Sequence, residues 1–220
     1  MTTFGDVPQE TGMRRLRRPI AHVLVALAAS LALVTVSATQ ANSQPEPLCG
    51  STLRVCISDA AYGNLNNAAV NHEQGGTNCN FYSGYWGNSG SDVCGWQNGF
   101  YFRSNEWCAD FARYIWYSAG ANVSGLDPWA GSFYRANRSN GHYHPKSSGY
   151  IPARGDAVLF DWDGTTASLG TDGWDIDHVG IVIEAVSGWQ NSIDGNWDNK
   201  VAFVGRNTSR VVGYVSPRPA

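Results

Sequence analysis

The chain has 220 residues, a formal net charge of −3 and 15% charged residues. It contains no basic stripe, which argues against nucleic acid as a partner. Its nine tryptophans, ten tyrosines and 25 glycines are typical of secreted carbohydrate-associated proteins, because flat rings stack on sugar faces. The same rings also fill protein cores, and several of the tryptophans are expected to do so.

The first 41 residues have the pattern of an export signal. Four arginines within residues 14–18 precede a mostly apolar run over residues 20–36, and small residues follow as far as Ala41. This order predicts cleavage after Ala38 or Ala41. An uncleaved membrane anchor is the alternative, but the apolar run is short for a span and is interrupted by polar residues. We therefore expect a secreted protein, extracellular or associated with a cell wall, without membrane contact after cleavage.

The remaining chain, residues 42–220, contains 11 basic and 16 acidic residues. Its length suits one domain with a sizeable core, and we expect a monomer. In an oxidising compartment four of the five cysteines should pair, leaving one thiol. Pairing Cys49 with Cys56 and Cys79 with Cys94 closes short loops, although two other pairings of these four are possible. Each of the three leaves Cys108 free.

Residues 42–99 are predicted to form a disulfide-stapled extension with little regular structure. The segment 53–57 could be a short strand, and residues 59–72 are weakly helical. Turns rich in glycine and asparagine follow up to residue 99. Residues 100–220 have a more regular pattern and are predicted to form the main domain.

A helix is predicted over residues 105–116. Trp107, Phe111 and Ile115 recur at helical spacing, so one face of this segment should be buried. Residue 104 or 105 is the expected N-cap, which places Glu106 in the first turn. Ala119 and Gly120 supply the stop.

Cys108 falls in the first turn of this helix. Unpaired backbone N–H groups and the positive end of the helix dipole favour a thiolate there. The same N–H groups can receive an oxyanion when the sulfur attacks a carbonyl. The alternative is a cysteine that only packs in an aromatic helix. An unpaired thiol in an exported chain favours the reactive interpretation.

The polar segment 126–149 contains His142 and His144, and this His-x-His pair could suggest a metal site. No set of Cys, Asp or Glu ligands accompanies the pair. The aspartates at positions 161 and 163 do not have the spacing of a calcium loop. We expect no metal and no cofactor.

From residue 152 onward the pattern changes to strands, which are predicted at 155–160, 177–183, 191–196, 200–204 and 211–215. Helices followed by an antiparallel sheet indicate the α+β class. His178 opens the second of these strands. Alone it would be a structural histidine, but together with Cys108 it is a candidate general base. Asp194 and Asn196 close the next strand and are candidates to fix the tautomer of His178.

Four segments together resemble the successive motifs of CHAP domains, the cysteine, histidine-dependent amidohydrolases/peptidases related to the papain-like NlpC/P60 group. They are Trp107–Phe111, Gly155–Phe160, Asp177–Val182 and Ile193–Asn196. The resemblance covers roughly residues 100–205. It implies a papain-like α+β fold, with N-terminal helices and the nucleophile at a helix start packed on an antiparallel sheet. Residues 100–220 would then be a CHAP catalytic domain.

On the family pattern, Cys108 corresponds to the nucleophile and His178 to the base. Asn196 matches the polar residue of a Glu-Gly-Asn type motif, and Asp194 stands where many members carry Glu. We expect Asn196 to contact His178 directly and Asp194 to act nearby. Three residues beside the motifs are expected to bind substrate: Trp107, Asp177 and Trp197.

The resemblance implies hydrolysis of amide bonds in peptidoglycan through an acyl-enzyme on Cys108. The bond could lie in the stem peptide or the cross-bridge, or join muramic acid to L-alanine. One alternative is a non-catalytic secreted protein that keeps the fold to bind cell walls or another partner. Another is an amidase that acts on a soluble peptide.

Overall fold

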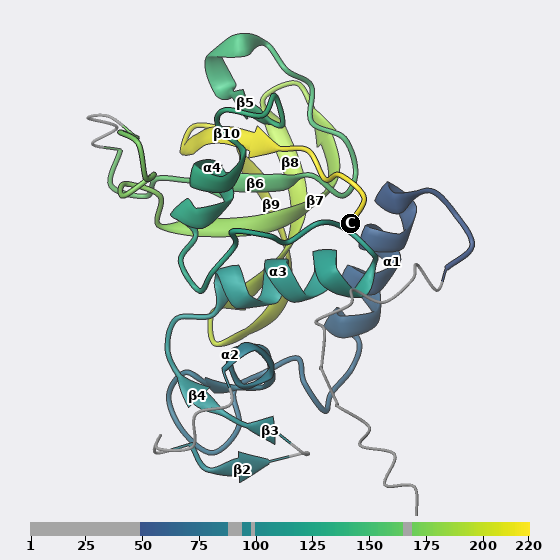
Figure 1. Ribbon diagram of the computed structural model, residues 1–220, viewed down its shortest axis with the longest axis vertical. Coiled ribbons are helices and arrows are strands. Elements are labelled where there is room, and N and C mark those ends of the chain that lie inside the picture. Colours follow the sequence, from purple (N-terminus) through teal and green to yellow (C-terminus); the bar gives the residue numbers. More distant parts are fainter. Residues whose placement is uncertain (1–48, 88–93, 98–99, 165–168) are drawn as a thin grey trace, which may run out of the picture. The chain divides into compact units, whose positions relative to one another are not determined.

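The structure, a computed structural model, describes residues 49–87, 94–97, 100–164 and 169–220 (Figure 1). The predicted signal peptide, residues 1–41, lies outside this part of the chain. The chain divides into two units, Met1–Gln40 and Ala41–Ala220, and all of the described residues lie in the second. None of its described helices combines the length and the apolar character needed to cross a bilayer.

The segment before residue 105 contains more regular structure than the sequence predicts. Its elements are α1 (Leu53–Leu65), β1 (Cys79–Asn80), α2 (Phe81–Trp86), β2 (Trp96–Gln97), β3 (Phe100–Tyr101) and β4 (Arg103–Ser104). Disulfides join Cys49 to Cys56 and Cys79 to Cys94, and Cys108 is free. The local pairing is therefore the one that the structure contains.

The strand expected at residues 53–57 is wrong, because this segment is the start of α1. Ile57 and Ala61 are fully buried and lie one helical turn apart. Their spacing presents one apolar face, and α1 packs with that core against α3 and the sheet. Tertiary packing thus decides the conformation of a segment whose local pattern is ambiguous.

Three further helices follow: α3 (Cys108–Ser118), α4 (Gly131–Asn137) and the short 3-10 helix η1 (Lys146–Ser148). The expected N-cap at residue 104 or 105 is wrong, and Glu106 lies outside the helix. The reason is that β4 pairs antiparallel with β1, so the chain is extended until Ser104. The helix ends at the expected stop, where Ala119 is the C-cap and Gly120 has φ of 84°.

The sheet has six strands in the order β5-β10-β6-β7-β8-β9, and every neighbouring pair is antiparallel. Their bounds are β5 Tyr143–Pro145, β6 Ala157–Phe160, β7 His178–Val186, β8 Trp189–Trp197, β9 Lys200–Asn207 and β10 Val211–Val215. The helices and this antiparallel sheet confirm the α+β class. Only β5 was not anticipated among these strands.

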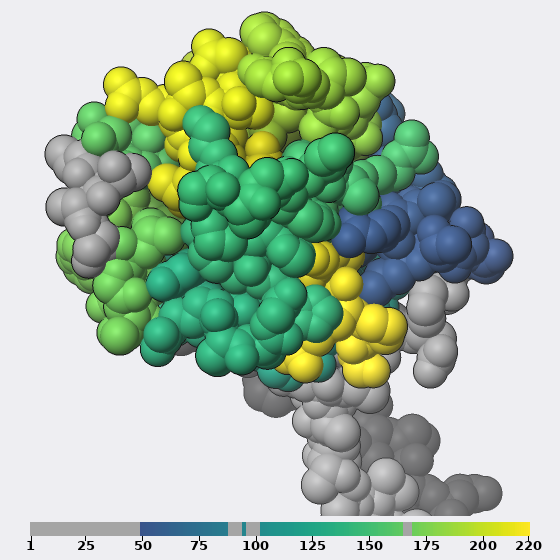
Figure 2. Space-filling model, turned by 90° about the horizontal axis from the view of Figure 1, so that it is seen from above, coloured from purple at the N-terminus to yellow at the C-terminus, as the bar shows by residue number. Residues whose placement is uncertain are grey.

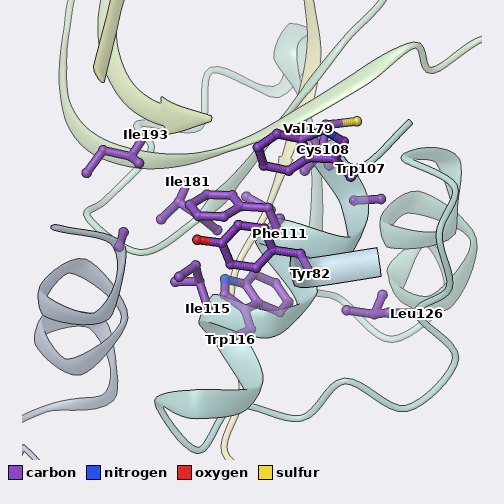
Figure 3. Packing of buried hydrophobic residues seen from close by; sticks show 14 of the residues in the cluster. Tyr82, Trp107, Cys108, Phe111, Ile115, Trp116, Leu126, Val179, Ile181 and Ile193 are labelled. Atoms are coloured by element: carbon purple, nitrogen blue, oxygen red, sulfur yellow. The ribbon is translucent and has the colours of Figure 1, made fainter. Parts of the chain in front are cut away.

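The main core lies between α3 and one face of the sheet, where α3 contacts β7 and β8 (Figure 1). Phe111 and Trp116 from the helix are buried there, with Ile181 and Ile193 from the two strands (Figure 3). Burial of each such side chain contributes about 1.5–3 kcal/mol. This core holds the start of α3 in place relative to β7 and β8.

The C-terminal residues pair with the loop that follows α3. The N–H of Asn122 donates to the carbonyl of Arg218 (2.8 Å), and the N–H of Ala220 donates to the carbonyl of Gly120 (3.1 Å). Figure 2 shows this last segment in yellow beside the teal segment that follows α3. The contacts fix the far end of the helix, so both of its ends are anchored.

Candidate active site

Cys108 is the first residue of α3 and is 6% exposed. Its sulfur lies at the edge of the core and points away from Ile115 and Trp116 (Figure 3). Asp110, one half-turn further on, is fully buried and accepts hydrogen bonds from Ser83 Oγ (2.8 Å) and Asn105 Nδ2 (3.3 Å). Burial raises the pKa of Asp110, against the effect of these hydrogen bonds. The contacts tie the start of α3 to α2 and so fix the position of Cys108.

His178 is the first residue of β7 and is also 6% exposed. Its Nε2 lies 3.0 Å from Oδ2 of Asp194, and Cys108 is close enough to the ring to raise the pKa of His178. The imidazole therefore lies beside a thiol on the helix and is paired with a carboxylate on β8.

The electrostatics of the site favour a charged imidazole. Burial lowers the pKa of His178, but the charge of Cys108 and the hydrogen bonds with Asp194 and Cys108 outweigh it and raise this pKa to about 10. At neutral pH a raised pKa of this size favours the protonated ring. Burial likewise raises the pKa of Asp194, yet its hydrogen bond with His178 and the charges of His178 and Arg206 hold it below the ordinary value.

Asp194 reaches His178 because a glycine lies opposite it. The pairing of Ile181 with Ile193 places Gly180 of β7 next to Asp194 of β8. A Cβ at Gly180 would lie 2.1 Å from Oδ1 of the carboxylate. Any side chain at position 180 would displace Asp194, which gives a physical reason for glycine in the Asp-His-Val-Gly segment.

We expected Asn196 to contact His178, and the structure instead places Asp194 there. A β-bulge between Asp194 and Trp197 interrupts the alternation of side chains along β8. Asn196 lies in this bulge with φ of 56°, a left-handed conformation that asparagine tolerates. Its amide donates to Glu106 instead. Asn196 therefore links the bulge to the segment just before α3.

The three residues expected at the substrate differ in position. Trp107 is fully buried, stacks on Tyr82 and donates from Nε1 to Glu73 (3.2 Å), so its side chain is a core residue and the expectation is corrected. Asp177 is exposed and accepts from the backbone N–H of Trp162 (2.7 Å). Trp197 is 37% exposed, with its ring centroid 6.0 Å from that of His178.

The His142–His144 segment lies elsewhere in the structure. Nε2 of His144 contacts Ser216 Oγ (2.5 Å), and its ring stacks on Tyr150 with 3.7 Å between centroids. Within the described ranges, no group of three or more His, Cys, Asp or Glu side chains could hold a metal ion.

Sequence reasoning missed three residues that adjoin the site: Phe160, Trp162 and Arg206. Arg206 donates from Nη2 to Oδ2 of Asp194 (2.5 Å). The predicted strand stopped at residue 204, whereas β9 continues to Asn207. The alternation of Ala202, Val204 and Arg206 on one face was the available signal, since it places the arginine on the face that bears Asp194.

The comparisons with known proteins assign a family to this part of the chain. A free thiol at a helix start lies beside a strand histidine that is hydrogen-bonded to a carboxylate. Residues 97–196 match the family model described as "CHAP domain", and this range includes Cys108, His178, Asp194 and Asn196. The chain therefore contains a CHAP domain. Such domains are in general cysteine- and histidine-dependent hydrolases that act on peptidoglycan.

The other comparisons add little. A solved structure titled "The crystal structure of Ly7917" matches with 14% identity and a TM-score of 0.38. The match covers 76% of this chain and 63% of that one, so this chain spans less than two thirds of that chain's length. A likeness so distant carries no argument about function. No curated protein matches the chain.

Proposed function

We propose that the protein is a secreted cysteine amidohydrolase or endopeptidase that cleaves amide bonds of peptidoglycan, with Cys108 as nucleophile, His178 as acid and base, and Asp194 as the third residue. The observation that carries the proposal is the position of His178, which is hydrogen-bonded to Asp194 on β8 and lies beside the free thiol of Cys108 at the start of α3. A structural histidine needs only one of these partners. The family match supports the choice of peptidoglycan.

The first half of the reaction forms an acyl-enzyme. The thiolate of Cys108 attacks the amide carbonyl carbon, and the resulting oxyanion is held by the backbone N–H of Cys108 at the helix start. The C–N bond then breaks while the imidazolium of His178 gives its proton to the departing amine. The amine leaves, and the acyl group stays on sulfur as a thioester.

The second half releases the acid. Neutral His178 takes a proton from water as the water oxygen attacks the thioester carbonyl. The C–S bond breaks, Cys108 leaves as thiolate, and His178 is again an imidazolium. Asp194 stabilises this cation in both halves through its hydrogen bond to Nε2, without accepting the proton itself.

Aromatic side chains next to His178 would form one wall for the substrate. Trp162 and Trp197 are both 37% exposed, and their ring centroids lie 5.6 and 6.0 Å from that of His178. They also line a cavity of about 240 Å³ whose other lining residues belong to β9 and the β9–β10 turn and do not include Cys108 or His178. Of the residues expected to bind substrate, Trp197 keeps that role in the proposal. Asp177 acts indirectly, through its hydrogen bond to the Trp162 backbone.

The proposed papain-like packing and the proposed export are supported by different features. The contact between the start of α3 and strands β7 and β8 fits a papain-like arrangement. The two disulfides are compatible with an oxidising compartment, and the signal-like first 41 residues favour secretion. We propose three parts for the chain: a signal at residues 1–41, a disulfide-stapled extension at 42–99 and a catalytic domain at 100–220. We also propose that the protein acts as a monomer.

Incubation of the protein with purified cell-wall sacculi, followed by mass spectrometry of the released fragments, tests the function. We expect muropeptides with new amine and carboxyl ends, formed without added metal and in the presence of EDTA. Brief treatment with iodoacetamide should abolish release, and peptide mapping should find the label on Cys108. Cleavage of a soluble peptide but not of sacculi would favour the soluble-substrate amidase. Binding to sacculi without release would favour the non-catalytic wall-binding protein.

A further inference from the structure

Asp194 has a second cationic partner that the reaction described above does not use. Nη2 of Arg206 lies 2.5 Å from Oδ2 of Asp194, and Nε2 of His178 lies 3.0 Å from the same oxygen. The side chain of Arg206 is only 12% exposed, and that of Asp194 is fully buried. Two cations from different strands thus converge on one carboxylate oxygen.

Three aromatic rings enclose this cluster, and we call Phe160, Trp162 and Trp197 the aromatic cage. The guanidinium carbon of Arg206 lies 4.6, 5.5 and 4.3 Å from their respective centroids. The centroid of His178 lies 5.9, 5.6 and 6.0 Å from the same three rings. Each ring therefore lies near both side chains, and cation–π attraction favours a guanidinium in the cage.

The other nitrogens of Arg206 have no competing partner. Within the described residues, its Nε and Nη1 are buried and make no hydrogen bond. The carboxylate of Asp194 is thus the one anion to which this guanidinium is hydrogen-bonded there. A surface ion pair would be screened by solvent, but this pair lies under aromatic rings, where charges interact strongly.

We propose that Arg206 is a positioning residue of the proposed active site: it keeps Asp194 ionised and holds Oδ2 toward His178. The inference rests on the proposed function, because it assigns a role within the same site. The charged and titratable groups that meet there are Cys108 from α3, His178 from β7, Asp194 from β8 and Arg206 from β9. Both His178 and Arg206 pair with the carboxylate of Asp194.

This arrangement explains why a short aspartate serves in the site. The carboxylate is held from one side by Arg206 and from the other by His178, and Gly180 leaves room for it. Although burial raises the pKa of Asp194, the hydrogen bond and charge of His178 and the charge of Arg206 lower it below its ordinary value. Without Arg206, His178 would be the one cation left, among the described residues, that pairs with this fully buried carboxylate.

The proposal is tested by titrating the ring of His178 by NMR in Asp194→Asn and in the double variant Asp194→Asn/Arg206→Met, with His178→Ala to assign the resonance. In Asp194→Asn the guanidinium remains without its carboxylate, so the pKa of His178 should fall. Removing Arg206 as well should raise it again, by about one unit, because a neighbouring cation has gone. Equal pKa values in the two proteins would overturn the proposal.

Turnover gives an independent measurement. Arg206→Met should lower kcat on sacculi by about tenfold or more, with a smaller effect on KM, since the loss is in orientation. Arg206→Lys keeps the charge but not the planar fork, so it should recover part of kcat. Lys200→Met, which removes an exposed cation from the same strand, is the matched control and should equal the parent. A parental kcat in Arg206→Met would overturn the proposal.

Folding is checked by circular dichroism before each measurement. If Arg206→Met does not fold, Arg206→Lys decides: a reduced kcat with a His178 pKa near the parental value supports positioning, and a parental kcat overturns it. The ring titration requires no substrate. If sacculi are not cleaved by the parent protein, the proposed function fails while the titration still decides the role of Arg206.

Discussion

Two of the buried aspartates each accept a hydrogen bond from an arginine, and their surroundings differ in a way that predicts different roles. Asp156 accepts from Arg54 Nη1 and Asp194 accepts from Arg206 Nη2, both at 2.5 Å, and both aspartate side chains are fully buried. Arg54 lies on α1 and is 35% exposed, whereas Arg206 lies on β9 and is 12% exposed. The first pair joins a helix to the sheet, and the second lies within the sheet.

The remaining partners of the two carboxylates account for their opposite pKa shifts. Asp156 also accepts from Tyr150 (2.9 Å) and from the N–H of Ala153 (2.8 Å), yet burial dominates and raises its pKa. At Asp194 burial acts in the same direction, but the cations of His178 and Arg206 outweigh it. Asp156, which is bound by neutral groups and by a partly exposed arginine, has a structural role. Asp194, which is held between two enclosed cations, can support a reacting imidazole.

The largest loss of activity should follow substitution of Cys108 or His178. Cys108→Ser should reduce release from sacculi by about a thousandfold or more, because a serine hydroxyl is far less acidic than a thiol. His178→Ala should be similarly inactive. The double variant should be scarcely worse than either single one, since the two groups act as a unit.

Arg54→Ala provides the comparison from the other buried pair and should leave the rate of release within about twofold, since α1 carries no reacting group. Rates are measured as muropeptide appearance on sacculi, with folding checked by circular dichroism. Parental activity in Cys108→Ser would exclude the cysteine-hydrolase mechanism. Loss of activity in a folded Arg54→Ala protein would abolish the distinction between the two aspartates.

The next largest change in turnover should distinguish the carboxylate of Asp194 from that of Asp156. Asp194→Asn should lower kcat by at least about tenfold, because the imidazolium loses its counter-charge. Asp156→Asn should keep kcat but lower the free energy of unfolding by about 1–2 kcal/mol, since hydrogen bonds from Arg54, Tyr150 and Ala153 are weakened. Turnover and urea unfolding of both variants measure this. Similar kcat values in the two variants would show that neither carboxylate has a special role.

The pH dependence of unfolding should have opposite signs at the two aspartates. The folded-state pKa of Asp194 is lowered, so its stabilisation is present above the unfolded value near 3.8 and is lost as pH falls through the folded value. The folded-state pKa of Asp156 is raised, so its contribution is present below 3.8 and is lost as pH rises through the folded value.

Urea unfolding between pH 7 and pH 3 compares the parent with each Asp→Asn variant. The advantage of the parent over Asp194→Asn should shrink below about pH 4. Its stability relative to Asp156→Asn should increase as the pH falls toward that value. The same pH trend in both comparisons would contradict the assignment of opposite shifts.

The sequence predicts the parts of the fold that depend on local pattern. The strand carrying His178 follows from a β-branched apolar run, and the local disulfide pairing follows from short loops. The helix of Cys108 follows from its apolar spacing, but its start does not. Only the pairing of β4 with β1 keeps residues 103 and 104 extended.

The sequence cannot predict contacts that depend on register between strands. Asp194 and Asn196 are two residues apart, so a regular strand would place both on one face. Only the bulge, set by the pairing of β8 with β9, separates them. Arg206 is likewise invisible until β9 is known to continue beyond residue 204. The burial of Trp107 against Tyr82 depends on α2, an element that the sequence did not predict.

The smallest expected change in turnover concerns Asn196. It distinguishes the contact of Asp194 with His178, found in the structure, from the contact of Asn196 with His178 that the sequence led us to expect. Its φ of 56° suits glycine and asparagine, and its amide contacts Glu106, not His178. Asn196→Gly should therefore keep kcat within about twofold, while Asn196→Ala should cost about 1 kcal/mol of unfolding free energy through backbone strain. If Asn196 instead oriented His178 directly, both substitutions would remove the same amide and lower kcat equally. Turnover and urea unfolding of the two variants, measured beside Asp194→Asn, separate these outcomes, because a glycine can rescue a backbone role but not a side-chain one.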